Sequence, residues 1–374
     1  MNEKVSIAIA INGLYVGGAE KFCVTLANRF VADGYSTTMF VFKKIDSPLL
    51  NLVDKRVELV YIQRSSKFDF ILHRRFNTEL EKRNISKVIF IGLFPLFLTR
   101  VLSFSRKLGI AHFISLHSTI PASFKIYLQN LFYLTFARKK DKVLFICNNQ
   151  RFFYNSKYFF KPAKFDVIYN GVDTEYYKPG VAPAGINQRK AMQIASSDKI
   201  ILLAATLRLE KGHRYAIESL KKLHTQYPGK LNTHLVFVGG GDERYISSLK
   251  KLTTDYSLES FVHFEGNQRD VRKYYEIADI FTLTSFSVET FSLAALEAMC
   301  YGLPLSLTNI GGASEMIVEG KNGLLSNARD TDSIASSWAN LLDVDFDAKV
   351  IREIAVNNFS LDKMFTKYRE AVRL

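Results

Sequence analysis

The sequence predicts an α/β protein made of two doubly wound domains, each a parallel sheet with helices on both faces. Three observations lead to this prediction. The chain has 374 residues, more than one ordinary domain core accommodates. Apolar segments of strand length alternate with segments of helical periodicity, as in parallel βα units. This alternation lapses after residue 172 and later starts again in the same order of strand, loop and helix.

The first series opens with the apolar segment Val5–Ile11, followed by a loop that contains Gly17 and Gly18. A helix is expected from Ala19 to about Asp33, because apolar residues recur there at helical spacing. Strand, glycine turn and helix in this order typically open a doubly wound sheet. Further strands are expected at 37–42, 57–62, 88–91, 111–116, 143–147 and 165–168.

A polar, turn-rich segment at 173–198 predicts a linker between domains at 1–172 and 199–359. A final helix at about 360–374 is expected to start at Ser360 as N-cap and to pack back toward the N-terminal domain through one apolar face. The second series has strands expected at 200–205, 235–238, 262–264, 280–283 and 305–307, with helices at 215–227 and 290–301.

Composition narrows the class of protein. A hydrophobic fraction of 48% and a mean hydropathy of +0.01 describe a globular chain rather than a disordered one. The longest apolar run, 88–98, is broken by Gly92 and Pro95 and is shorter than the roughly 20 residues of a membrane span. The three cysteines are isolated and form neither a disulfide nor a metal-ligand pattern, which fits the reducing cytoplasm.

The positive charge is confined to the N-terminal half. Residues 1–172 contain 26 basic and 11 acidic residues, an excess of 15, whereas the remaining 24 and 25 leave an excess of one acid. A field this uneven favours an anionic ligand or surface at the N-terminal half, through an attraction that salt weakens.

Two glutamates, Glu289 and Glu297, are separated by seven residues in the segment 285–302. A helix is expected to begin just after Glu289, with Glu297 about two turns inside. The backbone amides of Thr290, Phe291 and Ser292 would then be unpaired at the helix N-terminus, which is a ready site for an anion such as a diphosphate.

This segment, together with Gly302, Pro304 and the sequence GGASE at 311–315, resembles the E-x7-E region of retaining glycosyltransferases of family 4. The resemblance covers nearly the whole chain. It implies the GT-B fold, two Rossmann-like domains facing across a cleft, and no divalent metal or other cofactor. It also implies that Glu289 contacts the hydroxyls of a donor sugar and Glu297 the ribose of its nucleotide.

The segment TLRLEKGH at 206–213 follows an expected strand, so Arg208 and Lys211 lie at the carboxyl end of that strand, where open α/β sheets bind ligands. The resemblance implies that this basic pair grips the pyrophosphate of the donor. Fixed cations there would stabilise the charge of the leaving nucleoside diphosphate without a metal.

Glycines are the next candidates for donor binding. Gly17 and Gly18 permit close approach of backbone to a ligand because they carry no side chain. The resemblance places such a pair opposite the donor phosphates. Gly240, within the triple glycine 239–241, is a weaker candidate, since a tight turn alone accounts for glycine there.

His117 follows the strand expected at 111–116 and therefore lies at its carboxyl end. It resembles the cleft histidine of the family, near the reacting sugar, so it is a catalytic candidate beside Glu289. Ser118 stands where many relatives carry an acid, which leaves open what orients the histidine.

Asp343 and Asp345 form an acidic pair of the kind that binds a metal in metal-dependent glycosyltransferases, but no nucleotide-binding strand precedes this pair and metal binding is not expected there. We instead expect front-side displacement assisted by the leaving phosphate, with retained anomeric configuration. Trapping a glycosylated side chain would contradict this mechanism.

Aromatic and basic residues alternate in the segments 64–76, 124–142 and 151–164. This mixture suits an anionic membrane surface, unless the aromatic rings are core and the charges merely solvated. We expect a cytoplasmic protein that is peripheral on the inner face of the cytoplasmic membrane. It is expected to move a hexose or N-acetylhexosamine from a nucleotide sugar to a lipid-linked or saccharide acceptor in cell-surface polysaccharide synthesis. The frequency of nucleotides in the family favours UDP as the nucleotide of the donor.

Three alternatives stay open at this level. A sugar-nucleotide epimerase of the same fold would need no separate acceptor. A nucleotide-sugar sensor on this fold is disfavoured because the four charged candidate residues are all present. A nucleic-acid-binding protein would use the basic half, but the sequence contains no signature of a nucleic-acid-binding module, so no nucleic-acid partner is expected.

Overall fold

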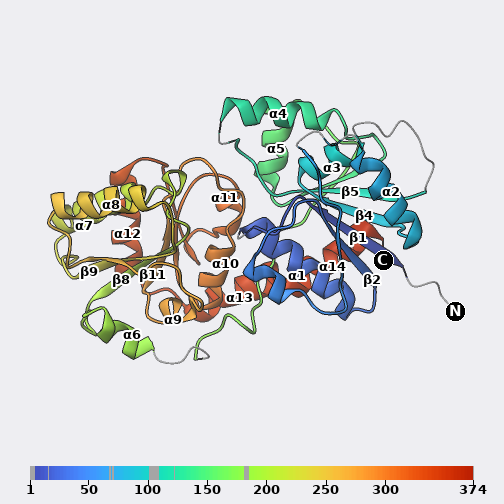
Figure 1. Cartoon of the computed structure of the whole chain (residues 1–374). Coiled ribbons are helices and arrows are strands. Elements are labelled where there is room, and N and C mark those ends of the chain that lie inside the picture. Colours follow the sequence, from blue (N-terminus) through green and yellow to red (C-terminus); the bar gives the residue numbers. More distant parts are fainter. Residues whose placement is uncertain are drawn as a thin grey trace. The chain divides into compact units, whose positions relative to one another are not determined.

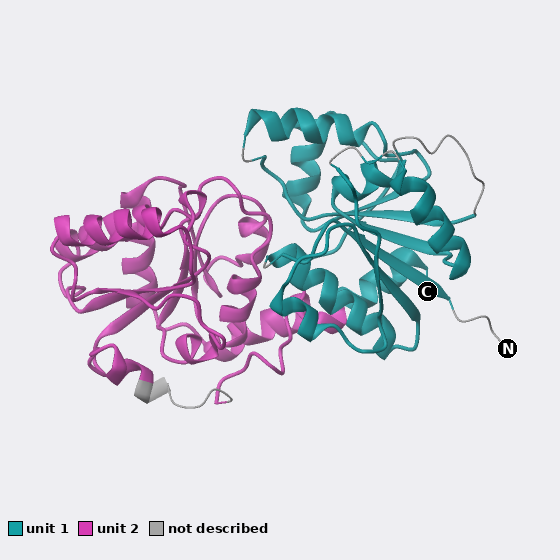
Figure 2. Cartoon of the chain, viewed as in Figure 1, with its two compact units in different colours: residues 1–169, 364–374 teal, residues 170–363 magenta. Residues whose placement is uncertain are grey.

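The computed structural model describes residues 5–15, 17–66, 69, 71–100, 109–121, 123–180 and 185–373. The chain divides into two compact units (Figure 2). Unit 1 comprises residues 1–169 and 364–374, and unit 2 comprises residues 170–363. Each unit contains one sheet of parallel strands, so the predicted fold class is confirmed.

Unit 1 is built on a seven-stranded sheet in the order β3-β2-β1-β4-β5-β6-β7 (Figure 1). The strand order reverses between β1 and β4, and ligands of doubly wound sheets bind at the carboxyl ends of strands at such a point. The strands are β1 (Ser6–Ile11), β2 (Ser36–Val41), β3 (Glu58–Tyr61), β4 (Lys87–Ile91), β5 (Ala111–Leu116), β6 (Lys142–Phe145) and β7 (Lys164–Val167).

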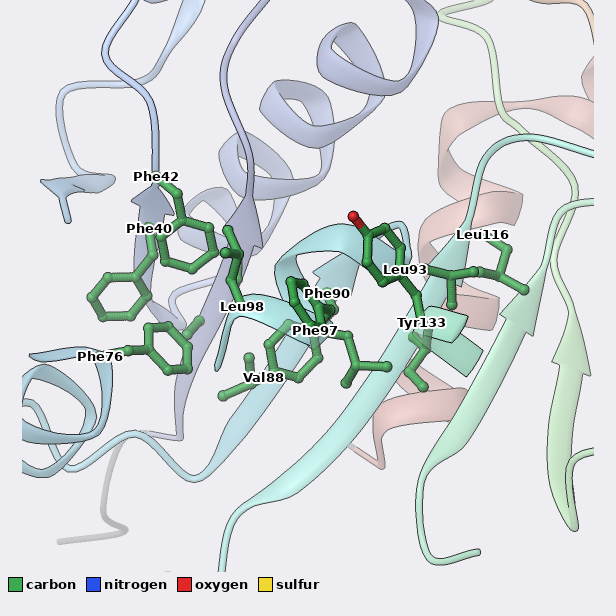
Figure 3. Close-up of a cluster of buried hydrophobic side chains, with 14 of the residues drawn as sticks. Phe40, Phe42, Phe76, Val88, Phe90, Leu93, Phe97, Leu98, Leu116 and Tyr133 are labelled. Carbon is green, nitrogen blue, oxygen red and sulfur yellow. The ribbon is translucent and has the colours of Figure 1, made fainter. Parts of the chain in front are cut away.

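One face of this sheet carries the main aromatic core of unit 1. Side chains at alternate strand positions, among them Phe40 and Phe90, pack with Phe76 and Phe97 from the covering helices (Figure 3). The rings of Phe40 and Phe76 meet edge to face, with centroids 5.1 Å apart. The helices of this face are α2 (Leu72–Lys82), α3 (Leu93–Arg100), α4 (Phe124–Leu134) and α5 (Asn148–Lys157).

The opposite face is covered by α1 (Gly18–Ala32) and by α14 (Leu361–Val372), the last helix of the chain. Ser360 accepts the amide of Lys363 at 3.3 Å, which confirms the predicted N-cap. The ring of Phe365 packs against Phe30 of α1, with centroids 5.1 Å apart. At the other end of α14, Lys87 donates to the Val372 carbonyl at 2.8 Å, so a cation satisfies a carbonyl of the last turn.

Unit 2 is built on a six-stranded sheet in the order β10-β9-β8-β11-β12-β13, and its strand order reverses between β8 and β11. The strands are β8 (Lys199–Ala204), β9 (Thr233–Val238), β10 (Val262–Phe264), β11 (Ile280–Leu283), β12 (Leu305–Thr308) and β13 (Gly323–Ser326). Its helices are α6 (Gly185–Ala191), α7 (His213–Gln226), α8 (Glu243–Asp255), α9 (Arg272–Tyr275), α10 (Leu293–Cys300), α11 (Ala313–Met316), α12 (Thr331–Asp343) and α13 (Ala348–Phe359).

Strand β13 and helix α6 are among the elements of unit 2 that were not predicted. Strand β13 has only two apolar residues between polar neighbours, too short a run to have a period of its own. Helix α6 lies inside the segment predicted as a linker. Tertiary contacts hold it, because the Arg189 guanidinium donates to the carbonyl oxygens of Asp198 at 3.0 Å and Ile277 at 2.8 Å.

Candidate functional site

The reversal point of unit 2 brings together two of the predicted site residues. Lys211 lies in the loop after β8, and Glu289 in the loop after β11, the neighbouring strand. Their side chains form an ion pair, with 2.7 Å between Lys211 Nζ and Glu289 Oε2. Both side chains are largely buried, with 20% and 16% of their surface exposed. A cation and an acid 78 residues apart thus occupy the place where such sheets bind ligands.

Backbone contacts tie these two loops together. Gly212 has a φ of +72°, and a Cβ there would lie 2.0 Å from the carbonyl oxygen of Thr284, so only glycine fits. The hydroxyl of Thr284 donates to the Gly212 carbonyl at 2.9 Å, and the Phe286 amide donates to the Glu210 carbonyl at 3.0 Å. These contacts fix the positions from which Lys211 and Glu289 extend.

Arg208 immediately precedes a 3-10 turn, Leu209–Lys211, and its residue is exposed. It lies on the same loop as His213, a fully buried residue at the start of α7. Burial lowers the pKa of His213 to about 3, with a smaller contribution from the charge of Lys211, so this ring is neutral at physiological pH. The predicted basic pair therefore consists of an exposed arginine and a lysine that is paired with Glu289.

The expected helix start after Glu289 is wrong. Helix α10 begins at Leu293, with Ser292 as N-cap, whose hydroxyl accepts the Ala295 amide at 3.3 Å. Residues 290–292 are not part of the helix, and two of their carbonyls are used elsewhere: Thr290 accepts from the Gly312 amide at 2.6 Å and Phe291 from Asn170 at 3.1 Å. The backbone amides at the helix N-terminus were predicted at residues 290–292. In the structure they belong to the residues that follow Ser292.

A small cavity adjoins this helix start, and its lining includes Glu289 and the three residues after it. Gly311, at the far side of the loop, has a φ of +56°, and a Cβ there would lie 2.3 Å from the Glu289 carbonyl oxygen. Gly311 thus lets this segment pack directly on the backbone of Glu289. The cavity is lined by Leu283, Ser285, Glu289, Thr290, Phe291, Ser292, Leu307, Thr308, Ala313 and Met316.

Glu297 lies one turn inside α10 rather than two, and only 7% of its surface is exposed. Tyr275 of α9 donates to Glu297 Oε2 at 2.9 Å, and the Tyr177 hydroxyl also bonds this carboxylate. Burial raises the pKa of both tyrosines, and the negative carboxylate of Glu297 raises it further. The structure therefore places Glu297 in a tyrosine-lined environment that sequence reasoning did not foresee.

The triple glycine has a structural role within unit 2. A Cβ at Gly239 would lie 2.1 Å from the Ala205 carbonyl oxygen, and one at Gly241 would lie 2.1 Å from that of Leu207. At Gly240 a Cβ would meet the side-chain amide of Asn267 at 2.4 Å. The two loops after β8 and β9 thus pack backbone to backbone at Gly239 and Gly241, which accounts for these two glycines without a ligand, and the role of Gly240 in donor binding stays a prediction.

Gly17 and Gly18 open helix α1 of unit 1, with Gly17 as its N-cap. Gly17 has a φ of −162°, which any residue adopts. Among the described residues, no atom lies within 4 Å of a Cβ built at Gly18, so packing in this part of the structure does not require glycine. The predicted close approach of a ligand to this turn stays a prediction.

His117 lies just after β5, and its orientation is set by residues that the sequence did not indicate. Its Nε2 lies 2.9 Å from the hydroxyl of Ser115, which in turn lies 3.0 Å from the hydroxyl of Tyr368 in α14. The ring of Phe22, from α1, packs on the histidine with centroids 4.4 Å apart. Burial lowers the pKa of His117 to about 4, so the ring is neutral at physiological pH.

Asp343 is the last residue of α12, and its carboxylate forms an ion pair with Lys230. Within the described residues, no group of three or more His, Cys, Asp or Glu side chains is arranged to hold a metal ion. No helix in the same part of the chain has both the length and the apolar character needed to cross a membrane.

Two family models match the chain, one on each side of residue 180. Residues 16–176 match the model described as Glycosyltransferase Family 4, and residues 186–356 match Glycosyl transferases group 1. The chain belongs to the GT-B glycosyltransferases of family 4. The resemblance first recognised around Glu289 is thereby confirmed at the level of the family.

Curated relatives match this chain over part of their length. A D-inositol 3-phosphate glycosyltransferase of Corynebacterium urealyticum is 31% identical over 189 residues, 49% of this chain and 44% of the relative. An Escherichia coli UDP-Gal:alpha-D-GlcNAc-diphosphoundecaprenol alpha-1,3-galactosyltransferase is 27% identical over 213 residues, 56% of this chain and 54% of the relative. This glycosyltransferase thus spans about half the length of the curated relatives it matches.

The fold likeness covers both units. Anabaena HepE, solved in complex with UDP and glucose, has a TM-score of 0.82 at 20% identity, over 98% of this chain and 99% of HepE. These comparisons support a glycosyltransferase and give the epimerase alternative no support.

Proposed function

We propose that this protein transfers a hexose or N-acetylhexosamine from a nucleoside diphosphate sugar, with retention of anomeric configuration and without a divalent metal. The acceptor is a lipid-linked or saccharide molecule used in cell-surface polysaccharide synthesis. Membership of the glycosyltransferase family supports the reaction class. The observation that carries the proposal is the Lys211–Glu289 ion pair at the reversal point of unit 2.

The chemistry of this pair suits a nucleotide-sugar donor. The leaving nucleoside diphosphate gains negative charge as the glycosidic bond breaks, and Lys211, Arg208 and the first amides of α10 supply fixed positive charge there. The carboxylate of Glu289 accepts hydrogen bonds from sugar hydroxyls. Because the ion pair and its loop contacts hold both side chains in place, little reorganisation is needed when the donor binds.

We assign the pyrophosphate to Arg208 and Lys211, the sugar to Glu289 and the ribose to Glu297. The carboxylate of Glu297 keeps acceptor capacity beyond its tyrosine bonds. UDP is the nucleotide we favour, since HepE was solved with UDP and glucose and the Escherichia coli relative is named for UDP-Gal.

The donor assignment predicts thermal stabilisation by one class of nucleotide sugar in the absence of metal. A panel of UDP-, GDP-, ADP- and CMP-linked sugars at about 100 times Kd should stabilise the chain by roughly 2.7 kcal/mol, a shift on the order of 5 °C or more for one nucleotide. The shift should shrink in Arg208→Ala, whose exposed side chain can be removed without disturbing the core.

Lys199→Ala is the matched control for this panel. Lys199 starts β8 and pairs with Asp279 at 2.9 Å, at the opposite end of the strand from Lys211, so the ligand shift should be unchanged. No shift with any nucleotide sugar, or an equal loss in Arg208→Ala and Lys199→Ala, would contradict the donor assignment.

We assign the acceptor to unit 1, whose residues carry the positive charge of the chain. From residue 117 to 165 there are nine basic residues and one acid, Asp141, which is buried against Arg100. The two curated relatives are named for acceptors that carry phosphate, an inositol 3-phosphate and a diphosphoundecaprenol. A phosphorylated acceptor would be attracted by this field.

Helix α4 adds an apolar surface to this basic region. Phe124, Leu128 and Phe132 recur at four-residue spacing and are 73%, 48% and 48% exposed, so one face of the helix presents apolar side chains to solvent. Lys139 and Lys140 lie exposed in the turn that follows. We propose that this face rests on the inner leaflet of the cytoplasmic membrane, with the lysines on anionic headgroups.

The membrane assignment predicts binding to anionic vesicles at low salt and little binding to neutral ones. Phe124→Gln combined with Leu128→Gln should weaken binding about tenfold or more, because each change removes about 1 kcal/mol of partial apolar burial. The control changes Leu52 and Leu231 to Gln, which are 58% and 59% exposed elsewhere on the chain. Equal vesicle binding by the α4 variant and the control would overturn the assignment.

A further inference from the structure

A chain of three polar side chains crosses the second face of the unit 1 sheet. Side chains alternate along β5, so Ile114 and Leu116 enter the aromatic core on one face while Ser115 points to the face covered by α1 and α14. There Tyr368, from the last helix, reaches the Ser115 hydroxyl at 3.0 Å, and Ser115 reaches His117 Nε2 at 2.9 Å. Tyr368 and Ser115 are both fully buried.

The protons of these two hydrogen bonds can be arranged in two ways. Either Tyr368 donates to Ser115 and Ser115 donates to His117 Nε2, or His117 Nε2–H donates to Ser115 and Ser115 donates to Tyr368. In the second arrangement the phenol O–H needs another acceptor. Among the described residues, Ser115 is the hydrogen-bond partner of the Tyr368 hydroxyl. An unpaired donor in this dry environment costs about 1–3 kcal/mol, so the first arrangement is favoured.

We infer that Tyr368 and Ser115 hold His117 as the tautomer with its proton on Nδ1, so that this ring offers a hydrogen-bond donor rather than a base to the ligand of unit 1. The ring of Phe22 packed on the histidine limits its rotation and keeps Nε2 directed at Ser115. Burial also keeps the imidazole neutral, since it lowers the pKa of His117 to about 4. Tyr368 and Ser115 are thus positioning residues.

This inference deepens the proposed function and rests on it for its consequence. If unit 1 binds the acceptor or the reacting sugar, the Nδ1–H of His117 donates a hydrogen bond to a substrate oxygen and does not remove a proton from it. The C-terminal helix, far from β5 in sequence, then contributes to the chemistry through one phenol hydroxyl.

The tautomer can be measured without any substrate. The full chain is labelled with ¹⁵N in its histidines, and a long-range ¹H–¹⁵N correlation spectrum distinguishes protonated from unprotonated ring nitrogens. The signals that disappear in His117→Gln identify His117. At neutral pH we expect a protonated Nδ1 and an unprotonated Nε2. A protonated Nε2 in the wild-type chain would overturn the inference.

Variants test the cause of the tautomer. Ser115→Ala and Tyr368→Phe should both shift His117 toward the Nε2–H form that a free imidazole prefers, whereas Tyr158→Phe should not. Tyr158 is a matched control, since its buried phenol accepts a hydrogen bond from Asn130 at 3.2 Å elsewhere in unit 1. An unchanged His117 tautomer in Ser115→Ala would show that the hydrogen bonds of Ser115 and Tyr368 do not determine this tautomer.

An activity measurement separates this inference from the proposed function. With a donor identified by thermal stabilisation, Tyr368→Phe should lower kcat severalfold and leave the donor KM unchanged. If no nucleotide sugar stabilises the protein, the proposed function is contradicted, but the measured tautomer of His117 still stands. A normal kcat in a variant whose tautomer has changed would overturn the role of His117 as a hydrogen-bond donor.

Discussion

Replacing Lys211 by alanine should lower kcat/KM by about 10²- to 10³-fold, the usual cost of removing one fixed group that stabilises charge developing in the transition state. The loss should be large because Glu289 and the loop contacts hold the Lys211 ammonium in a fixed position. It can be measured as the rate of nucleoside diphosphate release from the donor. Glu289→Gln, which keeps the shape but removes the charge, should also impair the reaction.

Lys199→Ala serves as the control for this experiment as well. Lys199 also forms an ion pair in unit 2, but at the amino end of β8, where no ligand is expected. A change there should leave kcat/KM within about twofold, in keeping with the small contribution of exposed ion pairs. Equal activity in the wild type and Lys211→Ala would remove Lys211 from the mechanism.

The largest effect on stability is expected at Asp141. Its carboxylate accepts two bonds from the Arg100 guanidinium, at 2.5 and 2.9 Å, and one from the Arg138 amide at 2.6 Å. Only 5% of the Arg100 side chain and 1% of the Asp141 side chain are exposed. Asp141→Ala leaves a buried, unpaired guanidinium and should reduce the free energy of unfolding by about 3–5 kcal/mol, measured by urea unfolding.

The matched change is Asp166→Ala, in the neighbouring strand of unit 1. Asp166 pairs with Lys142 at 2.5 Å, but 39% and 24% of these two side chains are exposed. Solvent screens such a pair, so its loss should cost less than about 1 kcal/mol. Similar unfolding free energies for the two variants would mean that burial does not govern the strength of the Arg100–Asp141 pair.

Local patterns in the sequence were enough to place most strands and the last helix. Twelve of the thirteen strands of the described residues were expected within about two residues, because buried parallel strands are continuous apolar runs between polar turns. The missed strand, β13, is four residues long and has no such run. The N-cap at Ser360 was also predictable, since capping depends on one side chain and the next three residues.

The start of α10 was beyond local reasoning. The sequence after Glu289 favours a helix, but Thr290 and Phe291 give their carbonyls to Gly312 and Asn170, 22 and 121 residues away in the chain. Because of these contacts with distant residues, the helix begins only at Leu293. Glu297 was likewise foreseen as a site residue, although nothing near it in the sequence indicates the tyrosines that surround it.

Apolar periodicity marks where each strand stops, and it thereby placed Arg208, Lys211 and His117 at the carboxyl ends of strands. Glu289 was identified by its spacing from Glu297 and the family resemblance. The partners of these residues became known from the fold. The order of strands places β8 beside β11 and so joins Lys211 to Glu289, and the return of α14 to unit 1 brings Tyr368 to Ser115. Such pairings depend on contacts between residues 78 and 253 positions apart, which no local pattern encodes.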